Sequence, residues 1–223
     1  MALILNIDTA TEKASICLSR EGKPLLLLQN EEQKDHASWL HVAVEQMLRQ
    51  TGYSMKDLGA VAVTAGPGSY TGLRVGMAAA KGFCYALNIP FIAENTLKVM
   101  ASAAREKVSP THLLCPMIDA RRMEVFTAIY RNDLVELMAP SAMIIDENSF
   151  SEYLSGQNLS FFGGGSNKCK PIITAPSASF IEINSNAGQL GILSFLRYLH
   201  QEFTELVYSE PAYTKEFYTH TIK

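Results

Sequence analysis

The fold of this chain is decided by residues 61–81, which read VAVTAGPGSYTGLRVGMAAAK. A β-branched apolar run stops at Gly66-Pro67-Gly68, and an alanine-rich segment with helical spacing begins a few residues later. This pattern predicts a strand, a tight turn and a helix. The two glycines can adopt conformations that are closed to other residues, and Ser69 or Thr71 is well placed to cap the helix. Such a turn suits a buried strand of an α/β domain.

The glycine-rich turn allows two interpretations. A helix N-terminus that follows such a turn can bind an anion, which suggests a phosphate site. The turn lacks the Gly-Lys-Ser/Thr ending of a Walker A loop, however, and it departs from the Rossmann pattern at the last glycine. Spacing alone therefore favours a structural turn over a phosphate cradle.

The helix predicted from Leu73 to Leu87 is apolar or small at almost every position. A helix that is apolar all round is covered on both sides. Its own sheet can cover one side, and the other side carries small residues that would let a second helix approach closely, namely Gly76, Ala79, Ala80 and Gly82. The segment is therefore either a central core helix of one subunit or a helix that is half buried by a partner.

The length and composition of the chain limit which classes of function it can have. The chain has 223 residues, enough for one large domain or two small ones. Its formal net charge of -3 is spread without blocks, so the chain by itself is a poor candidate for binding nucleic acid. The four cysteines form no Cys-x-x-Cys pair, which predicts buried reduced thiols. Because the sequence shows neither a signal peptide nor an apolar run of membrane-spanning length, we expect a cytoplasmic protein without a membrane partner.

The second half of the sequence repeats the first. Setting Ile7-Asp8 on Ile118-Asp119 brings strand, acidic turn, strand, turn and strand into register in both halves. Gly163-Gly164-Gly165 then takes the place of the Gly-Pro-Gly turn, followed by a shortened helix. The repeat predicts two related lobes, over residues 1–108 and 109–223, with a cleft between them.

Several motifs connect this pattern to known families. They are Ile7-Asp8-Thr9-Ala10, residues 63–76, Ala80-Lys81-Gly82, residues 119–125 and Glu210-Pro211-Ala212-Tyr213. In this order they are similar to motifs of the bacterial TsaB (YeaZ) family, a relative of the catalytic TsaD family. The duplicated lobes resemble the actin and sugar-kinase superfamily. The resemblance implies an α/β fold with two duplicated lobes of the actin-like ATPase or ribonuclease H-like type, with mixed sheets flanked by helices.

The resemblance to TsaD directs attention to residues 95–100. In TsaD-like proteins an Asn-His-x-x-x-His segment stands at this place, and its two histidines bind the catalytic metal. This chain has Thr96 and Met100 at the two ligand positions. A thioether is unsuited to a hard cation that prefers oxygen ligands. The comparison implies no metal site, no catalytic residue and no cofactor in this chain.

Asp8 and Asp119 also allow two interpretations. In actin-like ATPases the first-lobe aspartate orients a metal-bound water, and Asp119 across the cleft would complete such a pair. Alternatively, each aspartate ends its strand by bonding turn amides, which we favour. A weak nucleotide contact inherited from the superfamily would involve Asp8, Thr9, Gly66, Gly68, Asp119, Gly163, Gly164 and Gly165.

The resemblance to the TsaB family implies a noncatalytic role. The chain would be a partner in making the threonylcarbamoyl group on the adenosine beside the anticodon of tRNAs that read A-starting codons. TsaD would transfer the group, TsaE would be a further ATP-binding partner, and tRNA would be met only through the complex. In that family the first-lobe helices, here Asp35–Gln50 and Leu73–Leu87, pack against those of TsaD or of a second copy of the chain. The residues expected at this interface are Leu40, Val44, Met47, Leu73, Gly76, Ala79, Ala80 and Phe83.

Two other functions stay open at the level of sequence. The chain could be a phosphotransferase or ATPase that acts through Asp8 and Asp119, which a magnesium-dependent ATPase assay against Asp8→Ala would detect. It could also be a free-standing homodimeric regulator, and co-purification with TsaD would argue against that.

Overall fold

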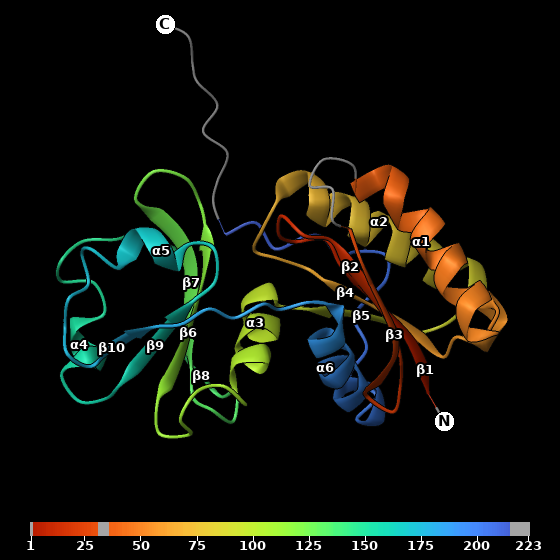
Figure 1. Ribbon diagram of the computed structural model, residues 1–223. Coiled ribbons are helices and arrows are strands. Elements are labelled where there is room, and N and C mark those ends of the chain that lie inside the picture. The colour runs from red at the N-terminus through yellow and green to blue at the C-terminus, as the bar shows by residue number, and fades with distance from the viewer. Residues whose placement is uncertain (1, 31–35, 215–223) are drawn as a thin grey trace, which may run out of the picture.

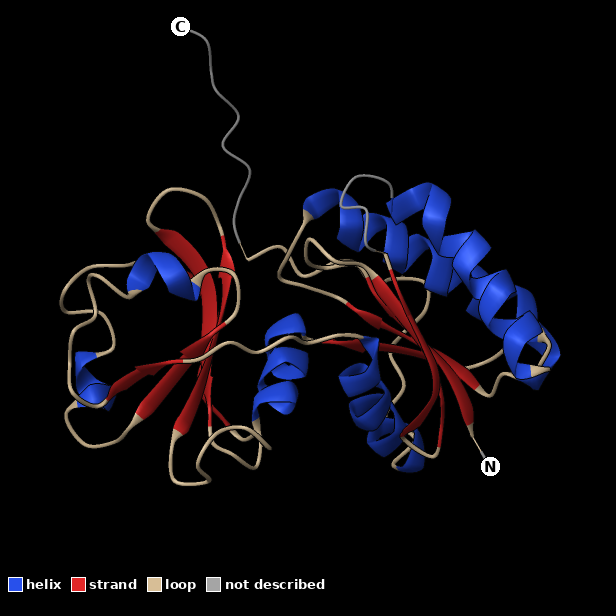
Figure 2. Cartoon of the chain, viewed as in Figure 1, coloured by secondary structure: helices blue, strands red, loops and turns tan. Residues whose placement is uncertain are grey.

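The computed structural model describes residues 2–30 and 36–214 (Figure 1). It has two lobes, each built around a five-stranded sheet (Figure 2). The first sheet runs in the order β3-β2-β1-β4-β5 and the second in the order β10-β9-β6-β7-β8. The strands of the first sheet are β1 (Leu3–Asp8), β2 (Ser15–Arg20), β3 (Lys23–Gln29), β4 (Ala60–Thr64) and β5 (Phe91–Glu94). Those of the second sheet are β6 (Leu113–Asp119), β7 (Glu124–Tyr130), β8 (Glu136–Ile144), β9 (Leu159–Phe162) and β10 (Ala178–Phe180).

The two sheets have the same topology. β1, β2 and β3 form an antiparallel meander, and β4 and β5 extend it in parallel from β1. In the second sheet β6, β7 and β8 form the meander, and β9 and β10 extend it in parallel from β6. The two orders therefore match strand for strand. This match confirms the predicted duplication and the α/β fold class.

Helices cover both faces of the first sheet. α1 (His36–Thr51) and α2 (Tyr70–Leu87) pack on one face, with Leu5 and Val61 among the strand residues of that core. α6 (Ala187–Leu199) packs on the other face, in a cluster with Ile4 and Ala62. Because both faces are buried, β1 and β4 read as continuous apolar runs rather than as alternating ones.

Two helices pack on the sheet that is formed by the other half of the chain, on the other side of the predicted boundary between residues 108 and 109. α6 follows the second sheet in the sequence, yet it contacts every strand of the first sheet. α3 (Thr96–Ala104) comes from the first half, yet it packs on β6 and β7. α3 and α6 contact each other between the sheets (Figure 1). Each sheet is thus covered by a helix from the other half of the chain, and the bounds 1–108 and 109–223 stay a prediction.

The remaining helices are short. α5 (Ser166–Cys169) is the second-lobe counterpart of α2, and it has 4 residues where α2 has 18. The shortened helix predicted from the repeat is therefore confirmed. α4 (Ser151–Leu154) and a 3₁₀ turn over Met55–Asp57 complete the set. Asp35, where the first long helix was predicted to start, lies outside the described residues. Within the described ranges no helix is long and apolar enough to cross a bilayer.

A buried polar network fixes α6 on the first sheet. The side-chain amide of Asn6 donates to the carbonyl oxygen of Cys17 at 3.1 Å and to Oγ of Ser19 at 2.9 Å. Its oxygen accepts from the hydroxyl of Ser194 on α6 at 2.6 Å. Buried polar groups are costly unless they are hydrogen-bonded, so this network selects one position of the helix over neighbouring ones.

Residues 204–213, which we call the strap, run from the end of α6 along β5 to the start of α2. The N–H of Thr204 donates to the carbonyl oxygen of Phe91 at 2.8 Å, and the N–H of Ala93 donates to Oγ1 of Thr204 at 2.9 Å. At the far end the N–H of Ala212 donates to the carbonyl oxygen of Ala65 at 2.7 Å. The strap thereby covers the outer edge of β5, where an open sheet would expose unpaired backbone groups.

Candidate functional site

The glycine-rich turn packs directly on the turn between β1 and β2. The N–H of Ser69 donates to the carbonyl oxygen of Ala10 at 2.7 Å. A Cβ on Gly68 would lie 2.2 Å from that same oxygen, and a Cβ on Gly72 would lie 2.0 Å from the carbonyl oxygen of Thr9. The hydroxyl of Thr9 in turn donates to the carbonyl oxygen of Gly72 at 2.7 Å. Close packing of two backbones therefore accounts for these glycines, as expected of a structural turn.

Asp8 closes the turn at the end of β1. Its side chain is buried, and Oδ1 accepts from the hydroxyl of Thr64 at 2.8 Å and from the N–H of Ala10 at 3.2 Å. Both donors belong to the residues that frame this turn. The carboxylate thus acts as an acceptor for its own lobe, which agrees with the interpretation favoured from the sequence.

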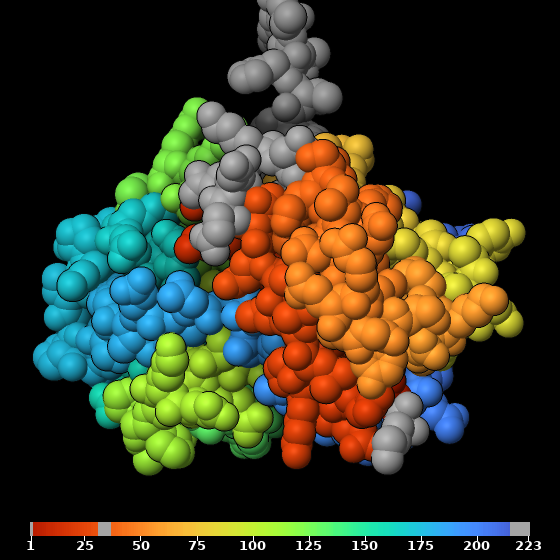
Figure 3. All heavy atoms as spheres, turned by 45° about the vertical axis from the view of Figure 1, so that its right-hand side comes forward, coloured from red at the N-terminus to blue at the C-terminus, as the bar shows by residue number. Residues whose placement is uncertain are grey.

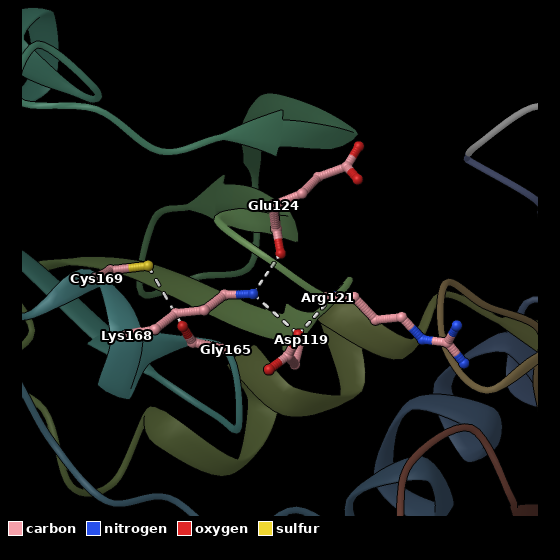
Figure 4. A network of polar contacts seen from close by, with 6 residues as sticks. All are labelled: Asp119, Arg121, Glu124, Gly165, Lys168 and Cys169. Carbon is pink, nitrogen blue, oxygen red and sulfur yellow. Dashed lines mark hydrogen bonds and ion pairs between the residues drawn. The ribbon is translucent and has the colours of Figure 1, made fainter.

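Asp119 does the same in the second lobe and has an additional partner (Figure 4). Its Oδ1 accepts from the N–H of Arg121 at 2.6 Å and from the ammonium group of Lys168 at 2.9 Å. Lys168 also donates to the carbonyl oxygen of Glu124 at 2.6 Å, while the side chain of Arg121 points away from the carboxylate. The hydrogen bond from Lys168, followed by that from the Arg121 N–H, holds the pKa of Asp119 below its usual value. A cation supplied by the chain itself therefore sits beside this carboxylate.

The residues at the TsaD metal-ligand positions are used for packing. Thr96 accepts from the N–H of Gly66 through its hydroxyl at 3.2 Å, and its own N–H donates to the carbonyl oxygen of Gly66 at 2.9 Å. Met100 is buried, and a Cβ on Gly163 would lie 2.4 Å from its terminal methyl group. Among residues 2–30 and 36–214 no group of three or more His, Cys, Asp or Glu side chains is placed to hold a metal.

The second-lobe glycines follow the first-lobe pattern in part. Gly163 has φ of 94°, which favours glycine, and the N–H of Gly165 donates to the carbonyl oxygen of Met117 at 3.0 Å. A Cβ on Gly165 would lie 2.9 Å from the carbonyl carbon of Ile118. Gly164 differs, because a Cβ there would meet no atom within 4 Å. Packing thus requires Gly163 and Gly165 but leaves Gly164 without a structural reason.

Most residues predicted at the partner interface lie inside the chain's own core. Of the predicted set, all but Phe83 are buried. Leu40, Met47 and Ala80 have no exposed surface, because α1 and α2 pack them on the first sheet. The interface assignment stays a prediction, and the residues exposed on the same helices lie beside the predicted set. The apolar periodicity of both helices reports burial against the sheet, and it does not mark the outer face.

The outer face of α1 and α2 carries a different set of residues. Figure 3 shows α1 across this surface, with the yellow part of the chain that holds α2 projecting beside it. Val42 is 64% exposed and Tyr85 is 82% exposed. Ala78 and Gly82 of α2 are also exposed, and a Cβ on Gly82 would meet nothing within 4 Å. Small residues flanked by large apolar ones form a surface that a second helix can approach closely.

The strap borders this face on the side away from α1. The ammonium group of Lys81 on α2 donates to the carbonyl oxygens of Val207 at 3.2 Å and Ser209 at 2.9 Å. Nε of Arg74 donates to the hydroxyl of Tyr213 at 2.9 Å. The motif at residues 210–213 gave no sign of this role in the sequence, and the spacing of Lys168 gave no sign that it pairs with Asp119.

Comparisons with known proteins identify a family and several relatives of this chain. The family model described as TsaD, tRNA N6-adenosine threonylcarbamoyltransferase, matches residues 30–190. The tRNA threonylcarbamoyladenosine biosynthesis protein TsaB of Bacillus subtilis is 33% identical over 144 residues, which are 64% of this chain and 62% of that protein. TsaB of Escherichia coli is 37% identical over 130 residues, 58% of this chain and 55% of that protein. The chain thus spans less than two thirds of the length of both relatives.

Solved structures establish the fold. YeaZ from Pseudomonas aeruginosa superposes with a TM-score of 0.81 at 24% identity, covering 96% of this chain and 100% of that one. The activator of 2-hydroxyisocaproyl-CoA dehydratase from Clostridium difficile, solved with bound ADPNP, superposes with a TM-score of 0.53 at 9% identity, covering 90% and 97%. These likenesses confirm the two-lobed actin-like fold predicted from the duplication. The chain belongs to the family whose model is described as TsaD, and the Bacillus subtilis and Escherichia coli relatives reported above are TsaB proteins.

Proposed function

We propose that this chain is a noncatalytic subunit in the synthesis of threonylcarbamoyladenosine on tRNA and that it acts by binding a TsaD-type transferase. The names of its TsaB relatives supply the process. TsaD would transfer the threonylcarbamoyl group, TsaE would join the complex, and tRNA would be reached through the complex in the cytoplasm. The chain would contribute a surface, and the transferase would contribute the chemistry.

The observation that carries this proposal is the outer face of α1 and α2. Val42 and Tyr85 are large apolar side chains with most of their surface exposed, and the small residues Ala78 and Gly82 of α2 are exposed as well. Exposed apolar patches of this kind mark interaction sites. A helix of the partner would lie along Ala78 and Gly82, because side chains of this size allow a close interaxial approach. A second copy of the chain would occupy the same face when the partner is missing.

The state of the two aspartates supports a noncatalytic role. Asp8 accepts hydrogen bonds from Thr64 and Ala10, and Asp119 accepts from Lys168 and the N–H of Arg121. An aspartate that orients a metal-bound water accepts a hydrogen bond from that water through a carboxylate oxygen. Here one oxygen of each carboxylate is already engaged within its own lobe.

The proposal is tested by Gly82→Arg, with Gly156→Arg as the matched control. A Cβ at either glycine meets no atom within 4 Å, and both residues are exposed, so neither change should disturb the fold. Arginine has a higher helix propensity than glycine, so Gly82→Arg should not lower the melting temperature. We expect Gly82→Arg to abolish co-elution with TsaD on gel filtration and Gly156→Arg to leave it intact.

A transfer assay completes the test. TsaD with the normal chain should modify tRNA, TsaD with Gly82→Arg should be as slow as TsaD alone, and this chain alone should show no turnover. An Asp119→Asn variant should support modification at the normal rate. Co-elution of Gly82→Arg with TsaD would rule out docking on α2, and turnover by the isolated chain would rule out the noncatalytic role.

A further inference from the structure

The strap presents its own apolar side chains beside the outer face of α2. Leu206 packs against the first-lobe core, while the next two residues point outward, with Val207 69% exposed and Tyr208 84% exposed. Lys81 fixes this part of the strap through the carbonyl oxygens of Val207 and Ser209. Tyr85 lies one helical turn beyond Lys81 on the same side of α2. Three of the most exposed large apolar residues of the described chain therefore lie around one lysine.

Arg74 fastens the other end of the strap. Its guanidinium carbon lies 4.0 Å from the ring centroid of Tyr70 and 6.0 Å from that of Tyr213. The two rings are 5.4 Å apart, and Nε of Arg74 donates to the hydroxyl of Tyr213. Cation–π contacts and a hydrogen bond thus join the first turn of α2 to the end of the strap. A groove of about 470 Å³ lies between α2 and the strap, with Met77, Ala78 and Pro211 in its walls.

The glycine-rich turn is shaped to receive the strap. A Cβ on Gly66 would lie 2.6 Å from the carbonyl oxygen of Ala212, and the N–H of Ala212 donates to the carbonyl oxygen of Ala65. Gly66 also has φ of 116°, which side chains rarely allow. The strap is therefore held at both ends and in the middle, so its exposed side chains belong to a preorganised surface.

We propose that the strap is part of the docking surface for the TsaD-type partner, which would contact Tyr85, Val207 and Tyr208 together. This inference rests on the proposed function, because it extends the same partner from the outer face of α2 across the groove. Tyrosine and arginine side chains are enriched among the residues that carry binding energy at interfaces. A preorganised surface also loses less conformational freedom on binding.

The charge and the apolar walls of the groove indicate which side chains of the partner would complement it. Its charged side chains are Arg74, Lys81 and Glu210, so the groove carries a net positive charge. A matching segment of the partner would place an apolar side chain in the groove above Met77 and Ala78 and an acidic side chain opposite Arg74. The acidic residue would then make the association weaken with added salt.

The test is the double variant Val207→Ser with Tyr208→Ser, measured by calorimetry against TsaD. Its matched control is Ile144→Ser, at a residue 74% exposed on the edge strand β8 of the other lobe. We expect the strap variant to bind TsaD at least tenfold more weakly, with an unchanged melting temperature, and the control to bind normally. Hydrogen exchange of the unmodified chain should show protection of amides 205–210 when TsaD is added.

The outcomes separate this inference from the proposed function. Normal binding by the strap variant, together with loss of binding by Gly82→Arg, would overturn the strap as a contact and leave docking on α2 standing. Normal binding by both variants would overturn both. If the double variant melts at a lower temperature, the exchange measurement decides, and unprotected strap amides in the complex would refute the inference.

Discussion

The ammonium group of Lys168 lies 2.9 Å from Oδ1 of Asp119 and donates a hydrogen bond to it. The two residues are far apart in the sequence, and α5 brings them together at the end of β6 (Figure 4). In the first lobe the equivalent aspartate, Asp8, accepts from a threonine hydroxyl instead. The two equivalent carboxylates therefore accept hydrogen bonds from different donors, a hydroxyl in the first lobe and an ammonium group in the second.

The Lys168–Asp119 pair predicts a small pH dependence of stability. Because folding lowers the pKa of Asp119 from 3.8, the pair stabilises the folded chain above that pH. The contribution is lost as the pH falls through the lower, folded pKa. The carboxylate is 55% exposed, so solvent screening limits the contribution to about 0–1 kcal/mol.

Urea unfolding of the normal chain and of Lys168→Met at pH 7 and pH 3 measures this effect. The difference in unfolding free energy between the two proteins should be larger at pH 7 than at pH 3. Carboxyl titration by NMR should place the pKa of Asp119 higher in Lys168→Met. An unchanged titration of Asp119 would mean that the lysine does not interact with the carboxylate in solution.

Gly72 and Gly82, both on α2, predict opposite effects of the same substitution. A Cβ on Gly72 would lie 2.0 Å from the carbonyl oxygen of Thr9, which is backbone and cannot rotate away. Gly72→Ala should therefore destabilise the chain by about 1–3 kcal/mol. A Cβ on Gly82 meets nothing within 4 Å, so Gly82→Ala should stabilise the helix by about 0.5–1 kcal/mol.

Thermal and urea unfolding of the two alanine variants compare these effects directly. The melting temperature should fall for Gly72→Ala and rise slightly for Gly82→Ala. Equal shifts in both variants would show that the effect of Gly72→Ala on stability comes from helix propensity and not from the close approach of Thr9.

The four cysteines predict slow thiol chemistry in the folded state. All are buried and unpaired, and burial raises the pKa of Cys17 and Cys115 to about 12 and that of Cys84 to about 11. Because the thiolate is the nucleophile, a higher pKa leaves less of the reactive form at neutral pH. A thiol-specific disulfide reagent at pH 8 should react over hours with the folded chain and within minutes in urea. Rapid reaction of the folded chain with one equivalent of reagent would identify an exposed, activated cysteine that the structure does not contain among its described residues.

Local patterns predicted the elements and their duplication. The run from Val61 to Lys81 indicates strand, turn and helix without knowledge of the rest of the chain, and each lies where the spacing places it. The offset from Asp8 to Asp119 indicated the repeat, because equivalent strands carry equivalent turns. The position of α6 could not be predicted in this way. Its apolar residues show that one face is buried, but periodicity does not say which of two sheets buries it.

The candidate site was harder to predict for the same reason. Helical periodicity identified Leu40 and Ala80 as covered residues, and both are, but by their own sheet. The signal for the outer face was the break in the pattern at Ala78 and Gly82, where small residues interrupt larger ones. The pairing of Lys168 with Asp119 could not be predicted, because the two residues are far apart in the sequence. Only the threefold glycine that precedes it pointed to this region.

The return of α6 and the strap to the first sheet has a consequence for biosynthesis. A ribosome that has released residues 1–108 has produced all five strands of the first sheet but not the helix and strap that cover its second face and its edge. Until the last quarter of the chain emerges, Ile4, Ala62 and Ile92 remain open to water or to a chaperone. The first lobe can therefore be completed only after α6 and the strap have emerged, so a truncation near the end of the chain should damage the lobe whose strands are made first.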